Sequence, residues 1–230
     1  MIDLEKDGNI FIVTMNNGQN MICPDWQKRM LEILDIMEKD KAAGTAMVII
    51  GEEKFFSNGL NLEVLSKLNN DGLATFAKNM SEIHRRMLIL PFPTVAAVNG
   101  HAFAGGAFIA MSCDYRIMRE DRGWICISEV DAGVPVSDPM MDILRGKLPP
   151  ATVRDAILTG KRYTADEAIA AGFAGSASAQ EAQTLRGDLL NLLGTSRRRR
   201  DTGMLDALVY AFMARDAIRQ MGSVRREGVA

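Results

Sequence analysis

Hydrophobic and polar positions change their spacing along the chain in a way that predicts strands and helices in turn. Residues 2–15 predict a hairpin, because two hydrophobic runs flank a polar Asp-Gly-Asn turn. Pro24 then opens a predicted helix whose apolar residues recur at helical spacing: Trp26, Met30, Ile33, Leu34 and Met37. Residues 47–51 are uniformly apolar, which is typical of a strand buried on both faces. Strand, helix and strand in this order predict an α/β fold with right-handed crossovers.

The helical pattern continues along the rest of the chain. Residues 71–90 predict a second amphipathic helix, with one apolar face made of Leu73, Phe76, Ala77, Met80, Ile83 and Met87. Residues 151–160 and 165–171 predict two shorter helices, the second opened by a Thr164–Glu167 capping box. Residues 185–193 and 204–221 are also predicted to be helical.

Two glycine-containing turns follow predicted strands and are candidates for a site. The first lies in FFSNGLNL, residues 55–62, where an open α/β fold places ligands. The second follows the apolar run 94–98, where Ala104-Gly105-Gly106-Ala107 precedes the start of a buried helix. Such a turn presents bare backbone N–H groups at the positive end of a helix dipole. Glu129 lies in another strand-then-turn context, so the pattern favours carbonyl chemistry: amides hold an oxyanion and a carboxylate moves a proton.

Length, charge and cysteine usage limit the classes of function. The 230 residues suit one large domain, which we divide into a core at 1–193 and a C-terminal helical segment at 194–230. The net charge of −2 gives no reason to expect a nucleic-acid partner. Cys23, Cys113 and Cys126 have no CxxC spacing, so we expect free thiols in a reducing compartment and no metal site. An N-terminus without a hydrophobic signal region, and no apolar run of membrane-spanning length, predict a cytoplasmic location and no membrane partner.

Five ordered segments carry a resemblance to a known family. From about residue 2 to about residue 175 the chain resembles the crotonase superfamily, also called the enoyl-CoA hydratase/isomerase family, in FFSNGLNL, AAVNGHAFAGGAF, SCDYRIM, SEVDAGVP and ILTGKRYTADEAIAAGF. The resemblance implies a spiral of stacked ββα units, an acyl-CoA substrate, and a homotrimer or a dimer of trimers. It also implies that the backbone N–H groups of Leu60 and Gly105 polarise a thioester carbonyl.

The carboxylates narrow this resemblance further. Hydratases of the family carry one glutamate shortly after the glycine turn, and Phe108 occupies that position here. The second glutamate is present as Glu129. This arrangement is similar to Δ3,Δ2-enoyl-CoA isomerases of fatty acid β-oxidation, which implies that Glu129 shuttles a proton while Phe108 forms an apolar wall of the acyl pocket. The implied reaction uses no metal or redox cofactor, since coenzyme A is part of the substrate.

Other interpretations stay open at this point. The same fold could serve a hydratase, a hydrolase or a dienoyl-CoA isomerase, for which Asp131 and Asp138 are the only nearby additional carboxylates. A non-catalytic acyl-CoA-binding protein is a further alternative, against which the retained Glu129 argues. We interpret His84 and His101 as structural residues. The run Arg197–Arg200 fits a solvated helix connection, a contact to CoA phosphates or, least well, nucleic-acid binding.

Overall fold

A computed structural model describes residues 2–42 and 44–175 of the chain. The described residues form sixteen helices and strands in the following order: β1 (Ile2–Asp7), β2 (Ile10–Met15), α1 (Pro24–Lys39), β3 (Ala46–Gly51), β4 (Phe55–Ser57), α2 (Leu62–Leu65), α3 (Asn70–Leu88), β5 (Thr94–Val98), β6 (His101–Phe103), α4 (Gly105–Ser112), β7 (Tyr115–Met118), β8 (Ile125–Cys126), α5 (Glu129–Ala132), α6 (Asp138–Lys147), α7 (Pro150–Thr159) and α8 (Ala165–Ala171). The sequence-predicted parts outside these residues are the helices at 185–193 and 204–221, the arginine run, and the whole 194–230 segment.

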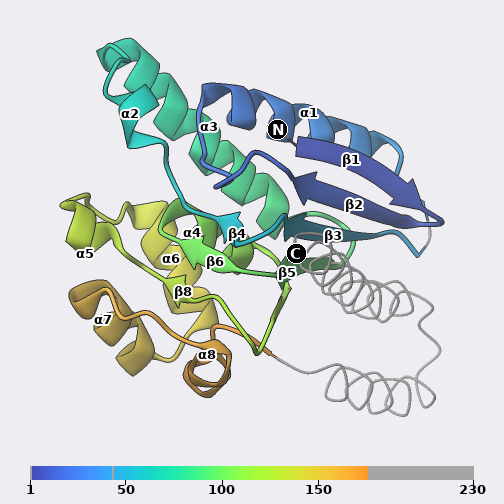
Figure 1. The fold of residues 1–230 in the computed structure, drawn as a ribbon. Coiled ribbons are helices and arrows are strands. Elements are labelled where there is room, and N and C mark those ends of the chain that lie inside the picture. Colours follow the sequence, from blue (N-terminus) through green and yellow to red (C-terminus); the bar gives the residue numbers. More distant parts are fainter. Residues whose placement is uncertain (1, 43, 176–230) are drawn as a thin grey trace, which may run out of the picture.

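Two sheets organise the molecule (Figure 1). The larger sheet has the order β1-β2-β3-β5-β7, and all its pairings are parallel except the β1–β2 hairpin. The smaller sheet has the order β4-β6-β8 and is parallel throughout. The chain alternates between them: β3, β5 and β7 enter the large sheet, and β4, β6 and β8 follow in the small one. This alternation confirms the predicted spiral of ββα units.

Most predicted elements are confirmed, with two informative differences. The hairpin pairs Asp7 with Ile10, so Gly8 and Asn9 form the turn. Glu167 accepts a hydrogen bond from the Thr164 N–H (3.0 Å), as expected of a capping box. Leu73 and Ala77 were placed wrongly on the apolar face of their helix, because both are exposed, Leu73 at 41%. The glycine turn of Gly105 follows the short strand β6 and not β5, since three residues are too few to show a strand pattern.

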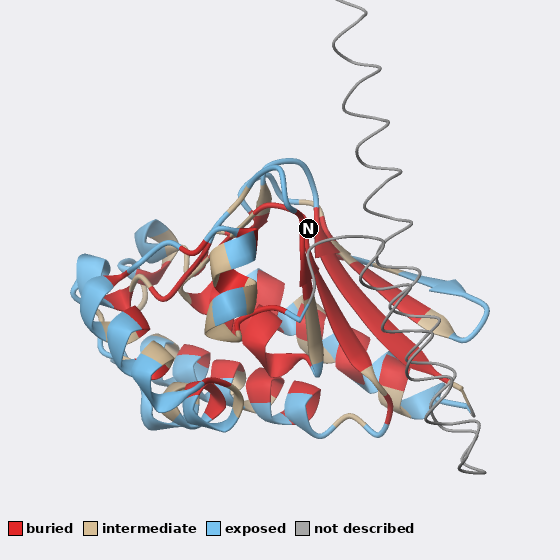
Figure 2. Ribbon diagram, turned by 90° about the horizontal axis from the view of Figure 1, so that it is seen from below, coloured by how far each residue is buried: buried red, intermediate tan, exposed pale blue. Residues whose placement is uncertain are grey.

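Helix α4 lies at the centre of the fold. All of its residues are buried, and it contacts strands of both sheets as well as helices α3 and α6. Figure 2 shows buried residues gathered on the strands and on the helix faces that turn toward them, while outward faces are exposed. The uniformly apolar β3 is buried along its whole length, as its sequence predicts. Burial of α4 on every side fixes the position of its N-terminus.

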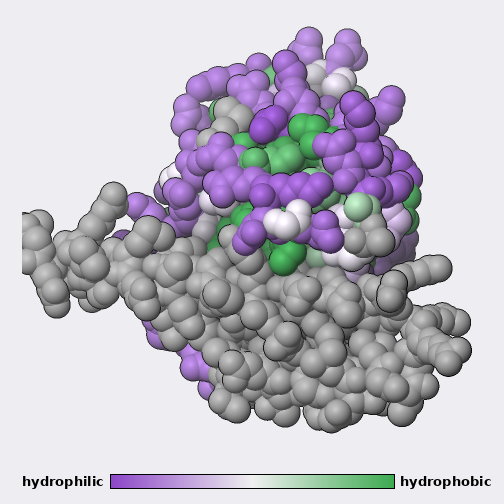
Figure 3. All heavy atoms as spheres, turned by 90° about the vertical axis from the view of Figure 1, so that its right-hand side faces the viewer, coloured by the Kyte–Doolittle hydropathy of each residue, from purple (hydrophilic) through white to green (hydrophobic). Residues whose placement is uncertain are grey.

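One face of the molecule is mostly hydrophilic where the described residues are visible (Figure 3). Seen from the right-hand side of Figure 1, the described residues present hydrophilic side chains around a smaller hydrophobic area (Figure 3). Among the described helices, none is both long and apolar enough to cross a membrane. The edge of the small sheet is covered by an antiparallel bridge, in which Ile125 and Tyr163 exchange backbone hydrogen bonds of 3.0 and 2.9 Å.

Candidate active site

The three residues singled out for chemistry follow the three strands of the small sheet. Leu60 lies three residues after β4, Gly105 two residues after β6, and Glu129 three residues after β8. Because these strands are parallel neighbours, their carboxyl ends meet at one edge of the sheet. Carboxyl edges of parallel strands are where α/β folds bind ligands. The fold therefore brings to one sheet edge segments that are up to 69 residues apart in the sequence.

The Leu60 amide faces away from its neighbouring chain segment. Leu60 forms a parallel bridge with Ile22, in which Ile22 N–H donates to the Gly59 carbonyl (2.8 Å) and Asn61 N–H donates to the Ile22 carbonyl (2.9 Å). In a parallel ladder the bridging residue's own N–H and C=O point to the opposite side. Within the described residues, the Leu60 N–H accordingly has no backbone acceptor.

The Gly105 amide is the first N–H of helix α4 and lies beside Leu60. A Cβ added to Gly105 would lie 3.2 Å from Leu60 Cδ2 and 3.3 Å from Ile22 Cδ1. The preceding residue, Ala104, has φ 47° and ψ −122°, a conformation that a residue with a side chain rarely adopts. This strained N-cap turns the chain sharply from β6 into α4. In the described part of the chain, the Gly105 N–H also has no backbone acceptor.

Glu129 carries a buried carboxyl group that forms no ion pair with another described residue. Its side chain is 6% exposed, and its Oε2 has no hydrogen-bond partner within the described residues. Burial raises the pKa of Glu129 from its ordinary 4.5 to about 7, because the charged form loses hydration. A carboxyl group whose pKa lies near neutrality can both accept and return a proton under physiological conditions. Two available amides and one such carboxyl group therefore occupy the same sheet edge.

Comparison with known proteins identifies the family. A sequence model described as enoyl-CoA hydratase/isomerase matches residues 5–192. The chain belongs to the enoyl-CoA hydratase/isomerase family.

Two relatives from Arabidopsis thaliana carry isomerase names. Enoyl-CoA delta isomerase 3 is 34% identical over 80% of this chain and 79% of that protein. The peroxisomal enoyl-CoA delta isomerase 2 is 33% identical over 77% of each chain. The crystal structure of an enoyl-CoA hydratase from Mycobacterium ulcerans Agy99 covers 95% of this chain and 98% of its own, with 26% identity and a TM-score of 0.73.

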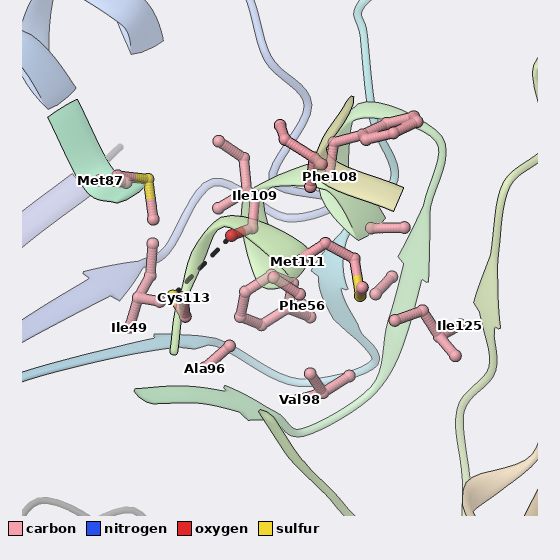
Figure 4. Close-up of a cluster of buried hydrophobic side chains, with 14 of the residues drawn as sticks. Ile49, Phe56, Met87, Ala96, Val98, Phe108, Ile109, Met111, Cys113 and Ile125 are labelled. Atoms are coloured by element: carbon pink, nitrogen blue, oxygen red, sulfur yellow. Dashed lines mark hydrogen bonds between the residues drawn. The ribbon is translucent and has the colours of Figure 1, made fainter. Parts of the chain in front are cut away.

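Phe108, predicted as a wall of the acyl pocket, is fully buried on α4. Its side chain is 0% exposed, and its ring meets that of His84 edge-on, with centroids 6.5 Å apart. Figure 4 shows Phe108 in a cluster of buried hydrophobic side chains that also includes Phe56 and Met111. In this member of the family no ionised group could stand at position 108 without losing its hydration. That Phe108 also borders an acyl pocket stays a prediction.

The two histidines lie outside this constellation. His84 is buried on α3, where its Nδ1 lies 2.8 Å from the Ser112 Oγ; burial lowers its pKa to about 4, so it is neutral. His101 lies on the outer face of β6, with its ring 5.2 Å from that of Phe103 and 4.9 Å from that of Trp124. Both sets of contacts agree with a structural role. Over residues 2–42 and 44–175, no cluster of three or more His, Cys, Asp or Glu side chains is arranged to hold a metal ion.

Sequence reasoning missed the residues that support the site. Ala104 was treated only as a small residue in a turn, and its strained backbone has no sequence signal. Asn20 and Ser57 hydrogen-bond to each other beneath the turn that carries Leu60, although neither was singled out. The available signal was the polar loop 16–20, which is rich in asparagine, a residue that tolerates left-handed backbone conformations.

Proposed function

We propose that this family member is a Δ3,Δ2-enoyl-CoA isomerase in which Glu129 alone carries the proton. One observation carries the proposal: among the acidic residues that the structure describes, Glu129 is the only one that is buried. It lies at the sheet edge that also holds the Leu60 and Gly105 amides. The isomerase names of the Arabidopsis relatives support the same choice.

The proposed reaction is a transfer of one proton along the acyl chain. With a 3-enoyl-CoA bound, the Glu129 carboxylate takes a proton from C2, and the C2–H electron pair enters the conjugated system as the dienolate forms. The protonated Glu129 then returns that proton to C4, which leaves the double bond between C2 and C3. The carboxylate is regenerated, so a single group serves as base and then as acid.

The two amides stabilise the charge that this step creates. The thioester oxygen becomes an oxyanion in the dienolate, and the Leu60 and Gly105 N–H groups are its proposed donors. Each donor of this kind is typically worth about 3–4 kcal/mol of transition-state stabilisation. The positive end of α4 adds to the field at Gly105. Because the donors are fixed before the substrate binds, little reorganisation is needed during the reaction.

The residue at position 108 favours isomerisation over hydration. Adding water to a 2-enoyl-CoA requires groups that hold and activate the water molecule. The buried Phe108 offers no polar atom for that purpose, and the hydrogen bonds available to Glu129 alone would leave the water poorly oriented. A dry apolar site also discourages side reactions of a reactive dienolate.

The wider context of the enzyme follows from this chemistry. The substrate is an acyl-CoA, and the reaction uses no metal or redox cofactor because the proton is its only transferred group. We propose assembly as a homotrimer or a dimer of trimers, a cytoplasmic location and a place in fatty acid β-oxidation. Neither nucleic acid nor a membrane is a proposed partner.

A spectrophotometric assay with paired variants tests the proposal. Isomerisation of 3-hexenoyl-CoA creates a conjugated enoyl thioester, whose ultraviolet absorbance should rise with the wild-type protein. Glu129→Gln should lower kcat by about 10⁴-fold, the upper end for an acid–base group, while binding of a saturated acyl-CoA persists. Asp131→Asn, which removes an exposed carboxylate from the same helix, is the matched control and should keep normal turnover.

Two results would contradict this assignment. Turnover close to wild type in Glu129→Gln would show that another group moves the proton. Loss of absorbance from added 2-hexenoyl-CoA at a rate above that of isomerisation would instead identify the protein as a hydratase.

A further inference from the structure

The loop that follows β2 is fastened along the turn that carries Leu60. Asn58 N–H donates to the Gln19 carbonyl (2.9 Å), and Ile22 pairs with Gly59 and Asn61 on either side of Leu60. These bonds hold the backbone of the turn from both ends. The Leu60 N–H is left facing away from the loop, so the loop decides the direction in which that amide points.

Asn20 is the junction of this loop. It is 0% exposed and has a φ of 51°, a left-handed conformation that asparagine tolerates better than most residues. Its Nδ2 donates to the carbonyls of Phe55 (3.1 Å) and Phe56 (3.2 Å), and its Oδ1 accepts the Asn17 N–H (2.7 Å). Both side-chain N–H groups are therefore used, and both tie the loop to strand β4.

Ser57 continues the connection to the residue before Leu60. Its Oγ donates to the Asn20 carbonyl (2.7 Å) and accepts the Gly59 N–H (3.3 Å). Ser57 is also 0% exposed, so these hydrogen bonds are not in competition with bulk water. A continuous relay, from Asn20 through Ser57 to Gly59, thus ends one residue before the proposed oxyanion donor.

From this relay we infer that Asn20 and Ser57 are positioning residues that aim the Leu60 N–H at the substrate carbonyl. Neither has a free polar hydrogen to offer a ligand, since Asn20 uses both amide hydrogens and Ser57 its hydroxyl hydrogen inside the relay. They act on the reaction only through Leu60. The inference rests on the proposed function, because it takes the Leu60 amide as an oxyanion donor.

The test measures carbonyl polarisation separately from turnover. Butanoyl-CoA labelled with ¹³C at the thioester carbonyl is a saturated, unreactive probe, and its infrared carbonyl band should move to lower frequency when bound to the wild type. In Ser57→Ala we expect the band to return roughly halfway to the frequency of the unbound probe, because the Leu60 N–H, one of the two donors, no longer points at the carbonyl. The same variant should lose about 10- to 100-fold in kcat on 3-hexenoyl-CoA, with KM changed less than about threefold.

Two further variants separate positioning from general stability. Ser112 lies at the C-terminal end of α4, where its buried hydroxyl donates to the Phe108 carbonyl (2.8 Å). Ser112→Ala should lower the melting temperature and leave the carbonyl band and kcat unchanged. Ser57→Cys keeps the shape of the side chain with a slightly larger atom and a weaker donor, and should give an intermediate band position. If Ser57→Ala does not fold, Ser57→Cys alone carries the comparison.

The outcomes distinguish this inference from the proposed reaction. A full band shift in folded Ser57→Ala, or in Ser57→Cys where the alanine variant is unfolded, overturns the positioning role. A wild type that shifts the band without isomerising 3-hexenoyl-CoA overturns the proposed reaction, and the Ser57 variants still decide the positioning role. A wild-type band that stays at its free position overturns the oxyanion assignment of Leu60 and this inference with it.

Discussion

At the scale of single residues, Glu129 shows how position changes the chemistry of an ordinary side chain. A glutamate at a strand end is usually solvated, with a pKa near 4.5. Here the fold buries it, and the loss of hydration raises its pKa to about 7. The sequence placed Glu129 at the site, but its pKa depends on packing by residues distant in the chain and could not be predicted.

The raised pKa of Glu129 predicts the pH dependence of the reaction. The first step needs the carboxylate, so kcat/KM for 3-hexenoyl-CoA should increase as pH rises and level off above about 7. The pH profile of kcat/KM at low substrate concentration measures this pKa in the free enzyme. Asp131→Asn should leave the profile in place. An inflection near 4.5 would mean that Glu129 is solvated in the working enzyme.

At the scale of elements, the sequence predicted long segments well and short ones poorly. Apolar residues at helical spacing predict the helices at 24–39 and 70–88, and an uninterrupted apolar run predicts the buried strand β3. Strand β6 has only three residues and went unrecognised, although it leads directly into the Gly105 turn. The left-handed backbone of Asn20 and the strain at Ala104 are set by neighbouring segments, which explains why residue type alone did not reveal them.

Helix α4 should be sensitive to any added side chain at Gly106. A Cβ there would lie 2.3 Å from the Ser57 carbonyl oxygen, which belongs to the rigid backbone of β4. Gly106→Ala should therefore push α4 away from β4, cost about 1–3 kcal/mol of unfolding free energy and weaken catalysis by moving the Gly105 amide. Urea unfolding and isomerase assays measure the two effects.

Gly146 provides the matched control for this substitution. It also lies in a helix, α6, but a Cβ built on it meets nothing within 4 Å. Gly146→Ala should be neutral or stabilising by up to about 1 kcal/mol, since alanine favours helix. Equal stability changes in the two variants would show that the approach of α4 to β4 is not tight.

At the scale of the whole molecule, two buried titratable groups make opposite contributions to stability. Glu129 binds its proton more tightly when folded, so its contribution is greatest below about pH 4.5 and is lost as pH rises through about 7. His84 binds its proton less tightly when folded, so its contribution is present above about pH 6.5 and is lost as pH falls through about 4. Each amounts to about 3 kcal/mol, and together they nearly cancel.

Single variants should reveal how each group makes the unfolding free energy depend on pH. In Glu129→Gln the His84 slope is no longer offset by that of Glu129, so the unfolding free energy should increase between pH about 4 and 6.5. In His84→Asn the Glu129 slope is no longer offset by that of His84, and the unfolding free energy should decrease between pH about 4.5 and 7 relative to the wild type. Urea titrations across this range measure both slopes. Curves parallel to the wild type in both variants would show that neither group is as buried as the structure places it.

The bridge between Ile125 and Tyr163 has a consequence for assembly. A spiral that adds one strand to each sheet per turn resembles a polymer with an open end, and its last parallel strand is a template for a further one. Tyr163 pairs with Ile125 through one isolated antiparallel bridge, so the segment beside β8 runs against the direction of the parallel strands and ends the repeat. The outward N–H and C=O of Ile125 are both used in this bridge, so they are not open to a further parallel strand. Tyr163 thus caps the small sheet and prevents the addition of another parallel strand at β8.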